Sequence, residues 1–160
     1  MTDPLAPPSE TAARQHWLAV LAHAARAPLA ERVQAIVDLP FETLRAPEIG
    51  LAMVRARIAN RGDRFNLGEV TLTRCVLRHR DEASGHVSVG VGCVLGRDPE
   101  RAGWVARLDA LLQQPAWHAG LMHEVIEPLA VSTRQRRERE QLDTATSRVH
   151  FYTLDAENGA

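Results

Sequence analysis

Hydrophobic residues recur at helical spacing over the first forty residues of the chain. Ser9 precedes a segment whose apolar side chains return every three or four positions through residue 25, which predicts an amphipathic helix. Pro28 predicts the start of a second helix, because its missing N–H is harmless in a first turn, and Pro40 predicts its end. We therefore expect a helical hairpin over residues 9–40, after a disordered, proline-rich lead-in at residues 1–8.

The next fifty-odd residues have the pattern of β-strands. Residues 41–45 predict a short strand closed by a turn at Ala46-Pro47. Residues 50–58 fit both the helical and the strand period, and we interpret them as a strand because residues 60–63, Asn-Arg-Gly-Asp, form a plausible turn into the next one. Residues 70–78 and 87–95 are rich in β-branched residues, and the loop at 80–85 joins them as an antiparallel hairpin. The middle of the chain is predicted to be a β-meander.

The last third is again helical. Asp98 is a good N-cap with Pro99 at the first helical position, and Trp104 begins an apolar stripe that continues through Leu112. Pro115 predicts the start of another helix that Pro128 stops, and residues 132–135, Ser-Thr-Arg-Gln, have the spacing of a capping box before a charged helix. Residues 147–154 alternate and predict a strand that returns to the sheet. The expected fold is a single α+β domain over residues 9–160, an antiparallel sheet flanked by the N-terminal helical hairpin and the C-terminal helices.

Composition places the chain among ordinary globular proteins. Its 160 residues are 45% hydrophobic and 24% charged, and no apolar run approaches the roughly 18 residues that a membrane span needs. The first ten residues, MTDPLAPPSE, lack the basic and apolar regions of a signal peptide. We expect a cytoplasmic protein with no membrane partner.

All nineteen basic residues are arginine, so any anion must be held by arginine, histidine or backbone amides. The net charge of −1 argues against nucleic acid as a partner. Residues 134–139 contain four arginines, but glutamates are interleaved with them and can form intrahelical ion pairs. This helix is predicted to face solvent or a protein partner.

Neither the cysteines nor the glycines nor the histidines form a recognised site. Two cysteines, Cys75 and Cys93, are too few for a cysteine-rich metal centre, and both are expected to be small buried apolar residues. Gly90 and Gly92 precede Gly96 by a spacing that does not fit a dinucleotide-binding loop, and we interpret them as a strand face that another backbone approaches closely. The seven histidines show no ligand spacing. We therefore predict no metal site in this chain.

A concentration of arginines and carboxylates between residues 44 and 98 is the strongest candidate for a site. Gly62-Asp63 and residues 66–68, Asn-Leu-Gly, are turn formers that would constrain the polar side chains beside them. Arg74 is in phase with apolar residues of its strand, so it needs a carboxylate partner, for which Glu48, Glu69 and Asp98 are available. A structural ion-pair network at the sheet ends is favoured over catalysis, and the Arg97-Asp98 pair lies where a helix N-terminus could bind an anion. The candidate residues for an interface or a shared site are Glu48, Arg64, Asn66, Glu69, Arg74, Arg97 and Asp98.

Five segments carry a resemblance to a known family. RQHWLAVLAHA at 14–24, RAPEIGLAMVRARI at 45–58, GDRFNLGEVTLTR at 62–74, VLGRD at 94–98 and SRVHFYTL at 147–154 resemble, in order, the G subunit of the bacterial carbon–phosphorus lyase system. The resemblance implies a subunit of a core complex that degrades alkylphosphonates as a source of phosphorus. It implies H, I and J subunits as partners.

The same resemblance implies the chemistry of the complex. ATP and methylphosphonate would give α-D-ribose 1-methylphosphonate 5-triphosphate and adenine, with the nucleosidase-like step on the I subunit. An iron–sulfur cluster and S-adenosylmethionine would belong to the J subunit, so no cofactor is expected in this chain, and no catalytic residue is implied for it. Two alternatives stay open: a stand-alone transferase that handles phosphate or nucleotide, and a nucleic-acid-binding module that uses the arginine-rich helix.

Overall fold

The computed structural model describes residues 10–58 and 61–146, and in them the predicted α+β architecture is confirmed. The elements along the chain are α1 (Glu10–His23), α2 (Arg26–Val33), a 3-10 turn (Gln34–Ile36), β1 (Glu42–Arg57), β2 (Arg64–Arg80), β3 (Val87–Leu95), α3 (Pro99–Leu112), α4 (Pro115–Leu121), a π-helical segment (Met122–Ile126) and α5 (Glu127–Thr146). The predicted lead-in at 1–8 and the predicted strand at 147–154 lie outside the described residues.

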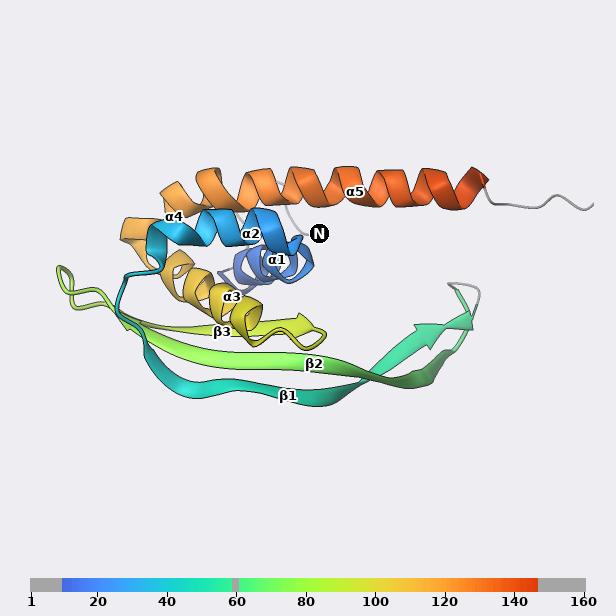
Figure 1. The fold of residues 1–160 in the computed structure, drawn as a ribbon, viewed down its shortest axis with the longest axis horizontal. Helices are drawn as coiled ribbons and strands as arrows, with labels where there is room; N and C mark the ends of the chain where they lie inside the picture. The colour runs from blue at the N-terminus through green and yellow to red at the C-terminus, as the bar shows by residue number, and fades with distance from the viewer. Residues whose placement is uncertain (1–9, 59–60, 147–160) are drawn as a thin grey trace, which may run out of the picture.

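The three strands form an antiparallel meander in the order β1-β2-β3, and all the described helices lie on one side of it (Figure 1). Helix α3 packs directly on the sheet, α1 and α2 pack against α3, and α5 packs on α1 at the greatest distance from the sheet. Eight of the fourteen residues of α3 are buried, which makes it the central helix of the core. No described helix lies over the opposite face of the sheet.

Strand β3 is where the helical layer comes closest to the sheet. A Cβ built on Gly90 would lie 1.9 Å from the carbonyl oxygen of Ala106, and one on Gly92 would lie 1.8 Å from that of Ala102. Only glycine leaves room for that approach, so the predicted close backbone contact at these glycines is confirmed.

The predicted break between two short strands at Ala46-Pro47 is wrong. One strand, β1, runs from Glu42 to Arg57, and Ala46 and Pro47 form a bulge between Arg45, which faces Val76, and Glu48, which faces Arg74. Proline is tolerated here because β1 is an edge strand and a bulge leaves its residue unpaired.

The predicted turn at residues 66–68 is also wrong, whereas the turn that precedes β2 is confirmed for its described residues, 61–63. Asn66, Leu67 and Gly68 belong to β2, and Leu67 is an extra residue between the pairs Val54↔Gly68 and Arg55↔Asn66. Long pairing with β1 absorbs the turn-forming residues as a second bulge. Gly62 closes the true turn by donating its N–H to the carbonyl of Ile58 at 2.7 Å.

The helix from Pro115 was predicted to stop at Pro128, with a new helix starting at Ser132. Both predictions are wrong, because the chain stays helical through Pro128 and Ser132 lies inside α5. The π-helical segment just before Pro128 widens the helix. Pro128 has no N–H to donate to the carbonyl of Glu124, and this carbonyl accepts a hydrogen bond from Arg32 instead. A side chain from α2 thus replaces the missing backbone donor.

Candidate functional site

The face of the sheet opposite the helices is the largest feature that the fold leaves unexplained. Antiparallel sheets with one open face usually present polar residues on it. Here β3 presents an apolar row, with Leu95 64% exposed, and Leu72 and Val76 of β2 lie half-buried beside it. The row on β3 consists of Val87, Val89, Val91, Cys93 and Leu95. A contiguous apolar surface of this kind is typical of a protein–protein contact.

Two ion pairs cross the same open face between β1 and β2. Arg74 donates from Nε to Glu48 Oε1 at 2.5 Å, and Arg78 binds Glu42. Both pairs are direct register partners in the sheet, and Arg45 lies 3.4 Å from Glu48. The predicted carboxylate partner of Arg74 is therefore Glu48. The ion-pair network predicted for this region is confirmed at these residues.

Arg74 is not buried, contrary to what its phase suggested. Its side chain is 57% exposed because no described element covers this face. An ion pair this exposed contributes at most about 1 kcal/mol to stability. A partner that covered the face would strengthen the attraction within the pair and would also remove both charged groups from water.

The other candidate residues are not brought together with Arg74. Glu69 points to the helix side of the sheet, because it is an odd number of residues from Arg74 along β2. Arg64 is ten residues from Arg74 on the same strand, which corresponds to roughly 30 Å at 3.3 Å per residue. Arg64, Asn66 and Glu69 lie on a hairpin that extends beyond β3 (Figure 1).

The N-terminus of α3 does not offer the anion site suggested for Arg97-Asp98. The Asp98 side chain accepts a hydrogen bond from the backbone N–H of Arg101 at 3.0 Å and caps the helix as predicted. Glu100 adds a second carboxylate in the first turn, and Arg26 pairs with both. An incoming anion would meet two carboxylates already in place. Arg97 itself is exposed.

A buried carboxylate that sequence reasoning missed joins α1, α3 and β3. Asp109 has no solvent exposure, and it accepts from Trp17 Nε1 at 2.9 Å, from Arg14 Nη2 at 2.7 Å and from the backbone N–H of Val91 at 2.9 Å. Arg14 and Gln113 also donate to the carbonyl of Val89. These contacts satisfy the free edge of β3 and protect it from pairing with another strand. The role of Asp109 is structural.

The two cysteines differ in a way that can be measured. Cys75 faces α3, and burial raises the pKa of its thiol. Cys93 is exposed in the middle of the apolar row. Its predicted burial is wrong because the described helices cover only one face of the sheet.

We expect a maleimide near neutral pH to modify Cys93 alone in the folded chain, and Cys75 only after unfolding, as read by intact mass and peptide mapping. Equal labelling rates at both sites would contradict this assignment, and a Cys93→Ser chain serves as the control.

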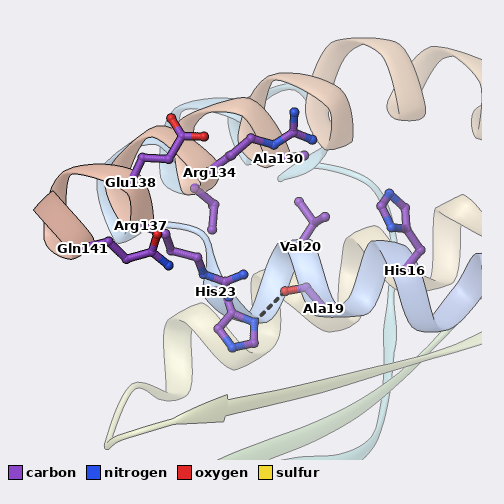
Figure 2. Close-up of a pocket in the computed structure, with 10 residues that line it drawn as sticks. His16, Ala19, Val20, His23, Ala130, Arg134, Arg137, Glu138 and Gln141 are labelled. Carbon is purple, nitrogen blue, oxygen red and sulfur yellow. Dashed lines mark hydrogen bonds between the residues drawn. The ribbon is translucent and has the colours of Figure 1, made fainter.

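A groove of about 600 Å³ lies between α1 and α5, with His16, His23, Arg134 and Arg137 on its walls (Figure 2). His23 Nδ1 is bonded to the carbonyl of Ala19 at 2.8 Å. The groove opens to solvent, and its lining mixes cationic groups with Glu138. This arrangement fits a hydrated or partner-facing surface better than an enclosed ligand site.

The arginine-rich helix is partly neutralised, as predicted. Arg136 lies 3.6 Å from Glu140 one turn later, and its guanidinium also donates to the carbonyl of His23 at 2.8 Å, which fastens α5 to α1.

Within residues 10–58 and 61–146, no group of three or more histidine, cysteine or carboxylate side chains is placed to hold a metal ion. Over the same ranges, no helix combines the length and apolar character needed to cross a bilayer.

Comparison with known proteins gives a consistent result. The model of a family described as phosphonate metabolism protein PhnG matches residues 12–155. A protein of Rhizobium meliloti (strain 1021), named α-D-ribose 1-methylphosphonate 5-triphosphate synthase subunit PhnG, is 37% identical over 144 residues, which cover 89% of this chain and 88% of the relative. The match extends over the open sheet face, the hairpin and the helices alike, and the chain therefore belongs to the PhnG family of phosphonate metabolism proteins.

Proposed function

We propose that this chain is a non-autonomous subunit of a complex that makes α-D-ribose 1-methylphosphonate 5-triphosphate from ATP and methylphosphonate, with release of adenine. The name of the Rhizobium meliloti relative supports the assignment. The observation that carries the non-autonomous role is the apolar open face, from Val87 to Leu95, because a stable single-chain enzyme would gain nothing from keeping such a surface in water.

Buried polar groups of the chain support an assembly role rather than a reaction centre. Asp109 is bonded to Trp17, Arg14 and the edge of β3. Thr73 donates its hydroxyl to the carbonyl of Gly96 and accepts from the N–H of Asp98. The hydrogen bonds of Asp109 and Thr73 thus join secondary-structure elements of this chain to one another. The groups that bind substrate are therefore assigned to neighbouring subunits.

The proposed partners are the H, I and J subunits of the carbon–phosphorus lyase core, in the cytoplasm where ATP is supplied. In this proposal the iron–sulfur cluster and S-adenosylmethionine belong to the J subunit and no cofactor belongs to this chain. Glu48 and Arg74 are assigned to the interface, because their ion pair lies across the same face as the apolar row.

The test is co-expression of a tagged chain with the H, I and J subunits, followed by pull-down and maleimide labelling. We expect a stable complex in which Cys93, reactive in the isolated chain, becomes protected as the sheet face is covered. The isolated chain should not convert ATP and methylphosphonate, whereas the assembled set should release adenine.

Two results would overturn the proposal. Turnover of ATP and methylphosphonate by the isolated chain would make it a stand-alone transferase. Failure to recover any of the three subunits, together with steeply salt-dependent binding to DNA, would favour the nucleic-acid-binding alternative. If a complex forms with Cys93 still fully reactive, the subunit role stands and the open face is not its interface.

A further inference from the structure

Beyond the last pair between β2 and β3, Leu72↔Leu95, strands β1 and β2 continue alone as a two-stranded hairpin (Figure 1). We call this hairpin the arm and define it as residues 51–57 and 64–71. It extends past α3, and the residues of its two strands are exposed or half-exposed. A two-stranded hairpin without a third strand or a covering helix is marginally stable in water.

One side of the arm carries two large apolar side chains near its root, with Glu69 opposite Met53 in the register. Leu51 is 67% exposed and Met53 is 53% exposed, on the side of β1 that faces the helices where the sheet is covered. Their exposed fractions show that the described helices leave both side chains largely uncovered. Exposed side chains of this size on a projecting ribbon are a liability for aggregation unless another protein covers them.

The same side of the arm is cationic at its tip. Strand alternation places Arg55 and Arg57 in line with Leu51 and Met53, and Arg57 is the register partner of Arg64. Like charges directly opposite on an antiparallel pair are destabilising. None of the ion pairs among the described residues includes these arginines. Arg57 instead donates to the carbonyl of Gly62 in the turn.

We propose that the arm inserts into a groove of a neighbouring synthase subunit, a groove with an apolar floor under Leu51 and Met53 and carboxylates at its closed end for Arg57 and Arg64. This inference rests on the proposed function and names a second contact, separate from the open sheet face. Carboxylates of a partner at the tip would offset the Arg57–Arg64 repulsion.

A protein is the occupant, and a free phosphate is not, because of the apolar root. A phosphate group would satisfy the arginines and leave Leu51 and Met53 in water. A groove on a folded partner contacts both the apolar and the cationic half of the arm, and it supplies the covering that an isolated hairpin lacks.

The experiment compares variants of the arm with matched variants elsewhere, in co-expression with the H, I and J subunits. Leu51→Asp is paired with Leu142→Asp, since Leu142 of α5 is also 67% exposed. The double variant Arg57→Glu/Arg64→Glu is paired with Arg139→Glu on α5, a position that does not line the groove between α1 and α5. Circular dichroism of each isolated chain first establishes that these exposed substitutions leave the fold intact. The readout is the amount of partner subunits recovered with the tagged chain.

Both arm variants are expected to recover at least about tenfold less partner than the wild type, and both α5 variants to recover wild-type amounts. Wild-type recovery by the arm variants would overturn the arm inference while the proposed function stands. Absence of partners even from the wild-type chain would overturn the proposed function and the inference with it. Full assembly of the arginine variant with a raised KM for ATP would assign the tip to phosphate and overturn the carboxylate groove.

Discussion

Replacing Gly92 with alanine is expected to lower the free energy of unfolding by about 3 kcal/mol, near the upper end of what overpacking costs. The new Cβ would lie 1.8 Å from the carbonyl oxygen of Ala102 and 2.7 Å from its carbonyl carbon. These are backbone atoms of α3, so no side-chain rotation relieves the clash. Helix α3 would have to move away from the sheet, and the packing of the core around Leu108 would open with it.

The measurement is urea unfolding of the isolated chain, followed by circular dichroism. Gly103→Ala is the matched control, because Gly103 lies on the same helix and a Cβ there meets nothing within 4 Å. Alanine at this helical position should leave stability unchanged or raise it by up to about 1 kcal/mol. If both variants unfold at the wild-type urea concentration, the close approach of α3 to β3 is wrong.

The second large effect is expected from Asp109→Ala, a loss of about 3 kcal/mol. The substitution removes the acceptor for Trp17 Nε1 and for the backbone N–H of Val91, and it leaves Arg14 without its carboxylate. Buried donors without acceptors lose their bonds to water and gain nothing in return. The edge of β3 also loses a group that blocks further strand pairing, so we expect the variant to aggregate more readily.

Thermal unfolding and light scattering measure the two consequences. Asp109→Asn should fall between the wild type and the alanine variant, because its amide oxygen keeps one acceptor in place. Glu48→Ala is the surface control: its ion pair with Arg74 is about half exposed, and its loss should cost less than about 1 kcal/mol. Equal destabilisation by Asp109→Ala and Glu48→Ala would remove Asp109 from its central structural role.

Sequence patterns predicted secondary structure correctly where the residues of one short segment are sufficient to determine its conformation. The strand at Val87–Leu95 follows from alternation, and the start of α3 follows from Asp98 and Pro99. The contact of Gly90 and Gly92 with another backbone was also expected, because a glycine inside a strand often marks a bulge or a close backbone approach.

Predictions failed where proline and turn formers were interpreted without their neighbours. Pro47 does not end a strand, because it lies in a bulge on the outer edge of the sheet. Pro128 does not end a helix, because Arg32 from another helix bonds to the carbonyl that the proline leaves free. In both cases the deciding group is distant in the sequence, so no local rule could find it.

Candidate-site residues divide in the same way. The need of Arg74 for a carboxylate is a statement about one side chain, and Glu48 was among the three partners named for it. Grouping Arg64, Asn66 and Glu69 with Arg74 assumed a compact turn, whereas β2 is a single strand of 17 residues that separates them. Asp109 gave no sign in the sequence, because an aspartate within a helix looks the same whether it faces water or three donors.

The sequence by itself determined the class of fold, the family, and the chemical limits set by nineteen arginines without lysine. Only the tertiary structure decided which surfaces stay uncovered. These are the apolar row of β3 with Cys93 on the open face, and the arm with Leu51 and Arg57, which extends past α3. The physical reason is that alternation divides a strand into two faces but does not say which face a helix will cover. Here α3 packs on the face where Gly90 and Gly92 leave room for its backbone, and the apolar row of β3 therefore lies on the exposed face.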